Sequence, residues 1–179
     1  MANLFIFSND LRLEDNSALY NASLGKNGLE ALFLFNKDKW QLHYESPLKI
    51  KFQLNNLEML KKELDYLNIN LKVLSPKLGD ENELILKEAL RINASKVFIN
   101  TEYGFNEKQR DENLRKLLAD NRIDLIEFDS SIINPKKIVT GAGTYFKVFT
   151  PYSRSFREEL NKEYLQCFPR PEKQQTKIG

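Results

Sequence analysis

The sequence predicts an α/β fold: a doubly wound, Rossmann-like domain with a five-stranded parallel sheet and helices on both faces. Five short apolar runs alternate with segments in which apolar residues recur at helical spacing. The runs are apolar at consecutive positions, which is typical of strands that are covered on both faces of a parallel sheet. Crossover connections between parallel strands are right-handed, so we expect the strand order 3-2-1-4-5.

The five apolar runs are each of strand length. We expect strands at residues 4–7, 29–35, 70–74, 96–100 and 123–128. The segments between them predict crossover helices at residues 16–23, 47–67, 80–91 and 106–120.

The second of these helices has the strongest signals. Ser46 is a suitable N-cap residue, and Pro47 fits the first helical position, where its missing N–H costs nothing. Five leucines at helical spacing then predict a buried stripe, at positions 54, 57, 60, 64 and 67.

The regular alternation ends near Asp129, where we place a domain boundary. We therefore expect an α/β domain over residues 1–129 and a connector over residues 130–179. Pro151 predicts the start of one helix, about 151–165, and residues 169–179 have the polar, proline-containing composition of a linker.

Composition limits the possible functions. A chain of 179 residues with 41% hydrophobic and 29% charged residues fits one globular core, and no apolar run is long enough to span a membrane. No secretory signal pattern is present, so a cytoplasmic location is expected. The formal net charge of +2 gives no support for independent nucleic-acid binding.

A single histidine, His43, and a single cysteine, Cys167, leave little basis for a metal cluster or a nucleophilic centre. Cys167 cannot form an internal disulfide, and we expect a half-buried thiol.

The loop after the first strand, residues 9–16, is the most informative polar segment. Arg12 is predicted to form an internal ion pair with a nearby carboxylate, although it could also clamp a ligand phosphate. Asp15 and Asn16 are N-cap candidates for the next helix. No glycine stands between Met1 and Tyr20, and Gly141-Ala142-Gly143 does not open a suitable helix, so neither a dinucleotide fingerprint nor a P-loop is present.

Three segments, in the same order, resemble the DNA photolyase and cryptochrome family. They are residues 9–16 (NDLRLEDN), 100–111 (NTEYGFNEKQRD) and 143–152 (GTYFKVFTPY). The resemblance is strongest to the N-terminal α/β, antenna-binding domain of folate-class CPD photolyases. It implies that the helical domain, which carries FAD and the DNA lesion pocket in the family, is absent from this chain.

The resemblance also implies a ligand site. In folate-binding photolyases a histidine after the second strand and an Asn-Glu pair at the start of the fourth crossover helix contact methenyltetrahydrofolate, so His43, Asn106 and Glu107 inherit that role, with Trp40 beside them. A carboxylate and an amide suit the donor edge of a pterin ring. Simpler structural roles remain open: Asn106 as a helix N-cap, Glu107 as a first-turn carboxylate, and His43 as an exposed loop residue.

The leading hypothesis is a light-harvesting domain that serves light-dependent DNA repair only together with a FAD-binding helical domain of the same or a separate chain. The chain alone would be inactive, and damaged DNA would bind through that partner. The antenna could be folate, a deazaflavin or none. The alternatives are a stand-alone nucleotide-binding α/β module, a cryptochrome-like photoreceptor fragment and a structural remnant.

A late aromatic group is expected to pack in a core or against a protein partner: Tyr145, Phe146, Phe149, Tyr152 and Phe156.

Overall fold

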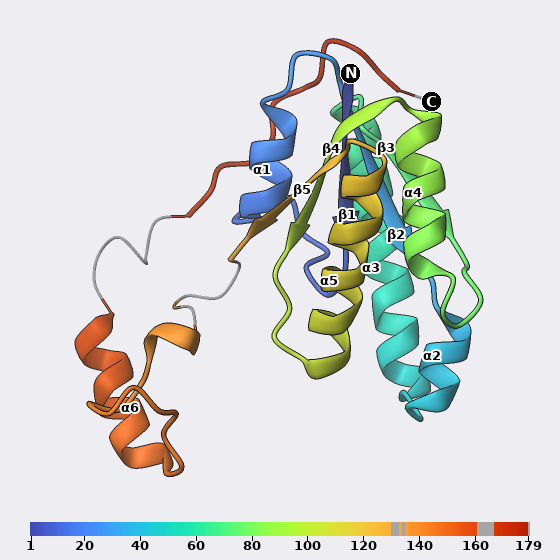
Figure 1. Cartoon of the computed structure of the whole chain (residues 1–179). Coiled ribbons are helices and arrows are strands. Elements are labelled where there is room, and N and C mark those ends of the chain that lie inside the picture. Colours follow the sequence, from blue (N-terminus) through green and yellow to red (C-terminus); the bar gives the residue numbers. More distant parts are fainter. Residues whose placement is uncertain (130–132, 134, 161–166, 179) are drawn as a thin grey trace.

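The computed structural model describes residues 1–129, 133, 135–160 and 167–178. Its centre is a five-stranded, all-parallel sheet with the order β3-β2-β1-β4-β5 (Figure 1). The strands are β1 (Ala2–Phe7), β2 (Leu29–Leu34), β3 (Asn70–Leu74), β4 (Ala94–Asn100) and β5 (Asp124–Phe128). The predicted fold class and strand order are confirmed, and the predicted strands begin or end within two residues of these bounds.

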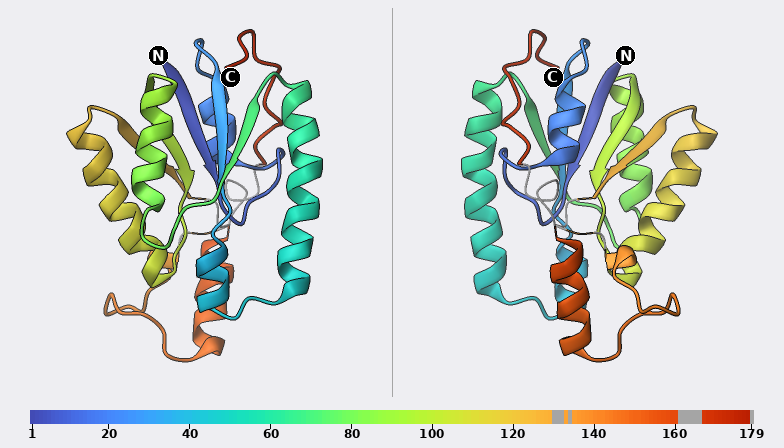
Figure 2. Two further views of the ribbon diagram at one scale, coloured as in Figure 1. Left: turned by 90° about the vertical axis from the view of Figure 1, so that its right-hand side faces the viewer. Right: turned by 90° about the vertical axis from the view of Figure 1, so that its left-hand side faces the viewer.

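Helices cover both faces of the sheet (Figure 2). One face is covered by α1 (Ser17–Ser23) and α3 (Pro47–Tyr66), and the other by α4 (Glu81–Arg91) and α5 (Phe105–Asp120). A short helix, α2 (Lys37–Leu42), follows β2, and η1 (Pro135–Lys137) and α6 (Phe149–Glu159) follow the sheet. Figures 1 and 2 show α6 apart from the helix-sheet layers, on the side where the strands end.

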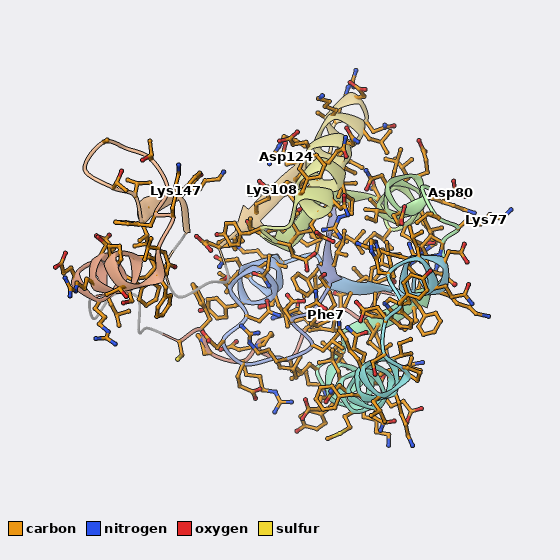
Figure 3. All side chains as sticks on the ribbon, turned by 90° about the horizontal axis from the view of Figure 1, so that it is seen from below. Phe7, Lys77, Asp80, Lys108, Asp124 and Lys147 are labelled. Atoms are coloured by element: carbon orange, nitrogen blue, oxygen red, sulfur yellow. The ribbon has the colours of Figure 1, made fainter. Side chains whose placement is uncertain are left out.

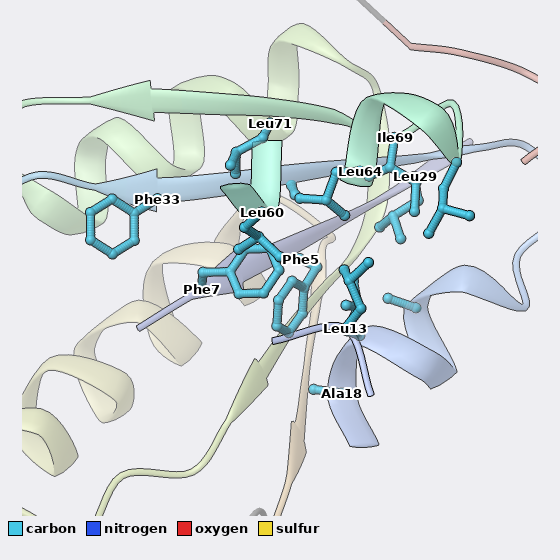
Figure 4. Packing of buried hydrophobic residues seen from close by; sticks show 14 of the residues in the cluster. Phe5, Phe7, Leu13, Ala18, Leu29, Phe33, Leu60, Leu64, Ile69 and Leu71 are labelled. Atoms are coloured by element: carbon cyan, nitrogen blue, oxygen red, sulfur yellow. The ribbon is translucent and has the colours of Figure 1, made fainter. Parts of the chain in front are cut away.

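The larger core lies between the sheet and the α1/α3 layer (Figure 4). Phe5 and Phe7 of β1 pack edge to face, with ring centroids 4.6 Å apart, against Leu60 and Leu64 of α3. Burial of these side chains supplies the main driving force for this layer, at roughly 25 cal/mol per Å² of apolar surface. Because β1 is central and buried on both faces, the loop that follows it is fixed in position by the core.

The leucine stripe of α3 is confirmed for Leu57, Leu60, Leu64 and Leu67, which are all buried. Ser46 does occupy the N-cap position and Pro47 the first helical position, but the Ser46 side chain makes no capping hydrogen bond. The predicted N-cap position is therefore confirmed without a capping bond, and the fixed φ of Pro47 remains the signal that starts this helix.

Two local expectations need correction. The sequence did not predict α2, because its six residues are mostly charged or polar and carry no apolar stripe. The last helix begins at Phe149, two residues before Pro151, and is described as far as Glu159; the rest of the predicted span 151–165 falls largely on residues 161–166, which lie outside the described part.

The tail also differs from the expected linker, because it is attached along the domain. The backbone N–H of Asp15 donates to the Phe168 carbonyl at 2.8 Å, and that of Gln174 donates to the Leu67 carbonyl at 2.8 Å. The Gln174 side chain, only 8% exposed, donates to the Ser23 carbonyl at 3.1 Å. The tail thus joins the C-terminal ends of α1 and α3.

Cys167, expected to be half-buried, is exposed.

Among the residues that the structure describes, no helix is long and apolar enough to cross a lipid bilayer.

Candidate functional site

A cavity of about 200 Å³ lies at the edge where β1, β2 and β4 end. From β1 the chain adds strands first on one side of the sheet (β2, β3) and then on the other (β4, β5), so the direction of strand addition changes between β1 and β4. Open α/β sheets bind ligands at such a switch point. Figure 3 looks onto this edge, with Phe7 at the end of β1 near its centre. Polar and charged lining residues come from six segments: Ser8 and Asn9 after β1; Asn36, Lys39 and His43 around α2; Glu45, Lys49 and Gln53 before and in α3; Glu81 of α4; Asn100 and Glu102 at β4; and Glu107, Arg110 and Asp111 of α5.

The buried side chain of Asn100, at the end of β4, connects the segments beneath the cavity. Its Nδ2 donates to Asn16 Oδ1 at 2.8 Å and also to Asp10. Its Oδ1 accepts from the Ser17 hydroxyl at 3.1 Å and from the Ala18 N–H at 3.2 Å. Asn16 caps α1 as predicted, since its Oδ1 accepts from the Leu19 N–H at 3.1 Å. The loop after β1 is thereby fixed to α1 and β4.

Arg12 lies in this loop but has a different partner from the one expected. Its Nε and Nη2 donate to the Asp15 carbonyl oxygen at 3.1 and 2.8 Å. Asp15 itself has a positive φ of 49°. The predicted carboxylate partner is replaced by a backbone oxygen, so the hydrogen bonds of Arg12 stay within the loop after β1.

One face of α2 faces the cavity. Asn36 caps this helix, because its Oδ1 accepts from the Lys39 N–H at 2.8 Å. Lys39, Trp40 and His43 follow at i+3, i+4 and i+7, and such positions share one helix face. The Trp40 indole packs edge to face on Phe35, with centroids 4.5 Å apart at 75°. The tryptophan ring is therefore anchored, whereas His43 is exposed at the C-cap.

Glu107 approaches the same cavity from the first turn of α5. Its Oε1 accepts from Lys39 Nζ at 2.9 Å. Its Oε2 lies over Gly104, where a Cβ atom would stand only 2.1 Å away. The hydrogen bond from Lys39 is the main cause that holds the pKa of Glu107 below its ordinary value, while partial burial opposes this shift. Glu107 is thus a carboxylate anion at neutral pH.

A second charged group lies farther along α5. Arg110 Nη2 is 2.7 Å from Asp111 Oδ1 and 3.3 Å from Glu102 Oε2. Burial disfavours the charge on Arg110, but Asp111 and Glu102 outweigh it and raise the pKa of the guanidinium. Burial raises the pKa of the Asp111 carboxyl, with Arg110 opposing the shift. Asn9 Nδ2 donates to Glu102 Oε1 at 2.8 Å, so this group is continuous with the loop after β1.

The structure brings three of the four predicted site residues together. Trp40, His43 and Glu107 all line the cavity. Asn106 is exposed and is not among the lining residues. It is not the helix N-cap either, because Gly104 occupies that position. Neighbouring positions on a helix point about 100° apart, so Asn106 and Glu107 cannot both face inward.

Sequence reasoning missed Lys39, the direct partner of Glu107. The signal was present as the spacing of Asn36, Lys39, Trp40 and His43, which matches one face of a helix. A second cavity, of about 320 Å³, lies against α3 and the beginning of β3. This second cavity lies at the edge where the strands begin, and open α/β sheets bind ligands at the edge where the strands end. It is therefore a weaker candidate for a ligand site.

Comparisons with known proteins address the family and the fold of this chain. The family model described as DNA photolyase matches residues 3–172. A deoxyribodipyrimidine photo-lyase from Buchnera aphidicola subsp. Baizongia pistaciae is 32% identical over 173 residues, which cover 95% of this chain and 36% of that protein. The chain spans about a third of the length of the curated relatives it matches.

Two solved structures show the same fold. A cryptochrome from Synechocystis sp. PCC6803 has a TM-score of 0.80 at 22% identity and covers 95% of this chain and 36% of its own. An archaeal photolyase from Sulfolobus tokodaii, described with two FAD molecules and a novel light-harvesting cofactor, has a TM-score of 0.72 at 22% identity, over 97% of this chain and 38% of its own. With the family model matched over most of the sequence, the chain belongs to the DNA photolyase family and corresponds to its N-terminal α/β domain.

Proposed function

We propose that this chain is the light-harvesting domain of a CPD photolyase and that its cavity holds the ring of methenyltetrahydrofolate. The observation that carries the proposal is the grouping of Trp40, His43 and Glu107 around one cavity at the switch point of the sheet. The similarity to curated photolyases supports the same role.

The cavity chemistry fits a flat ring with a donor edge. The Glu107 carboxylate can accept N–H bonds, Trp40 offers an anchored aromatic surface, and His43 can donate or accept. The volume of about 200 Å³ is below the roughly 300–1,000 Å³ of pockets that enclose drug-sized ligands. The cavity therefore suits a bicyclic head group whose remainder extends outside it.

This geometry divides the roles of the four predicted residues. Glu107 would fix the donor edge, Trp40 would limit the position of the ring plane, and His43 would contact the ring from the exposed end of α2. Asn106, exposed beside Glu107, would contact only the part of a ligand that leaves the cavity. A bound methenyltetrahydrofolate would supply absorption of near-ultraviolet light for a FAD-containing helical domain, through which damaged DNA would bind.

A binding experiment tests the proposal. The purified chain is titrated separately with methenyltetrahydrofolate, FAD and ATP, and absorbance and Tm are recorded. We expect folate to shift its absorbance and raise the Tm, since ligand at about 100 times Kd adds about 2.7 kcal/mol of stability. In Glu107→Ala the folate affinity should fall about tenfold, which is the value of one hydrogen bond to a charged group.

Glu112→Ala is the matched control, because Glu112 is an exposed carboxylate on the same helix. The free Glu107→Ala chain should keep nearly the same Tm, since a partly exposed ion pair contributes about 0.2–1 kcal/mol. Equal folate binding by the Glu107→Ala chain and the unmodified chain would contradict the proposed site.

The titration also separates the alternatives. A response to ATP alone would favour a stand-alone nucleotide-binding module, although Arg12 is occupied by the Asp15 carbonyl. A response to FAD alone would favour a flavin antenna, as the description of the Sulfolobus tokodaii photolyase suggests for that protein.

A further inference from the structure

The Glu107 carboxylate already has an internal partner in the position that a ligand would use. Lys39 Nζ lies 2.9 Å from Oε1, and both side chains line the cavity. The side chains of Lys39 and Glu107 are 34% and 25% exposed, so the ion pair is partly shielded from solvent. The donor edge of an entering ring would therefore meet a carboxylate that is already bonded to an ammonium group.

The other oxygen lies against the start of α5. Oε2 lies over Gly104, at a place where even a methyl group on that residue would overlap it. The carboxylate is thus folded back onto the start of α5, and Oε1 is the oxygen that Lys39 bonds. A ligand donor that approaches Oε1 therefore has to compete with Lys39.

The position of Lys39 depends on α2. The Asn36 cap fixes the first turn of this helix through the Lys39 N–H, and the Asn36 side chain is itself bonded to Glu81. Lys39 reaches from α2, which follows β2, to α5, which follows β4, and so bridges the switch point. The ion pair also holds the pKa of Glu107 below its ordinary value. Glu107 therefore stays a carboxylate anion, which can accept a hydrogen bond from a ligand.

We propose that Lys39 is an internal competitor for the antenna site: it occupies Glu107 in the ligand-free chain and is displaced when a ring with N–H donors binds. This inference rests on the proposed function and adds a residue that sets the affinity of the same site. The inference predicts the direction of the change in affinity. Removal of Lys39 strengthens binding of a neutral ring, whereas removal of a direct ligand contact weakens it.

The expected effect is modest but measurable. A partly exposed ion pair contributes up to about 1 kcal/mol, so its removal should tighten binding of a neutral ring up to about fivefold. Salt also weakens such a pair, although less than it weakens a fully exposed one. The unmodified chain should therefore bind a neutral ring more tightly as the salt concentration rises.

The experiment uses unsubstituted pterin, which has the donor edge of folate but no carboxylate tail. Its affinity is measured by calorimetry at pH 7 at low and high NaCl for the unmodified chain, Lys39→Gln and Lys37→Gln. Lys37 is an exposed lysine on the same helix and serves as the matched control. We expect Lys39→Gln to bind about two- to fivefold more tightly with no increase in affinity at high salt, and Lys37→Gln to behave like the unmodified chain.

A second measurement needs no variant. The acetylation of individual lysines by acetic anhydride is followed by mass spectrometry with and without pterin, and Lys39 should become more reactive when pterin displaces it. Weaker or unchanged pterin binding by Lys39→Gln, or protection of Lys39 by pterin, would overturn the inference while the proposed function stands. Failure of every chain to bind either pterin or methenyltetrahydrofolate would instead overturn the proposed function.

Discussion

At the scale of single residues, the shape of the candidate site depends on the absence of a side chain at Gly104. Its φ of −63° and ψ of 151° are open to any residue, so glycine is not required there by backbone conformation. The space matters instead, because a Cβ would lie 2.1 Å from Glu107 Oε2 and the carboxylate would have to move. Gly104 therefore sets where the carboxylate can rest.

Replacement of this glycine should separate binding from stability. In Gly104→Ala the Glu107 carboxylate has to swing away, and pterin or folate affinity should fall about tenfold, the value of a hydrogen bond to a charged group. The backbone angles suit alanine, so the Tm should fall only by the preference of the N-cap position for glycine over alanine. Titration calorimetry and thermal unfolding check both expectations. Gly141→Ala, where an added Cβ meets open space, is the control, and equal losses of affinity in the two variants would refute this role for Gly104.

The Glu107 pair also predicts a pH dependence of stability. Because the pKa of Glu107 is lower in the folded chain, the pair stabilises the fold above the usual value of 4.5, and this stabilisation is lost as the pH falls through the folded-state value. The difference in unfolding free energy between the unmodified chain and Glu107→Gln should be up to about 1 kcal/mol at pH 6 and should shrink below pH 4.5. Urea unfolding across this pH range measures it, with Glu112→Gln on the same helix as the control.

At the scale of elements, a charged network ties β2 and β3 to α4. Glu30 of β2 is fully buried and accepts from Arg91 of α4 and from Asn70 Nδ2 at 3.2 Å. Arg91 also donates to Glu88 at 2.7 Å, and Lys72 of β3 is 2.6 Å from Glu88. A buried carboxylate is tolerated only when it is paired, so Arg91 is the residue on which Glu30 depends.

The two ends of this network should respond unequally to mutation. Arg91→Ala leaves Glu30 as a buried, uncompensated charge and should cost about 3–5 kcal/mol. Glu30→Gln removes that charge, while Arg91 keeps Glu88 and a half-exposed position, so the cost should be smaller. Unfolding in urea measures both variants, with Lys87→Ala on the exposed side of α4 as the control. A larger loss in Glu30→Gln than in Arg91→Ala would contradict this view.

At the scale of the whole molecule, the sheet could be predicted from the sequence because its strands are apolar at consecutive positions. Residues such as Leu4 and Phe5 are both fully buried on opposite faces of β1, and that is the signal of a central parallel strand. The family resemblance implied the grouping of Trp40, His43 and Glu107, and the topology is consistent with it, since β2 and β4 flank β1 and their ends meet at one edge.

Other parts could not be predicted, for physical reasons that differ. Helix α2 is too short and too polar to show an amphipathic pattern, so the Lys39 partner of Glu107 was missed. Asn106 was expected beside Glu107 in the site, but helical phase turns it outward. Gln174 looked like part of a polar linker, because composition does not show that its amide meets the Ser23 carbonyl at the end of α1.

The attached tail determines where the ends of the described chain lie. Ile178 packs beside Gly28, which precedes β2, and Figure 1 shows both chain ends at the edge where the strands begin. A strand of six residues is about 20 Å long, so both ends stand roughly that far from the cavity. An affinity tag or a surface tether placed at either end should consequently leave the mouth of the cavity open to molecules in solution.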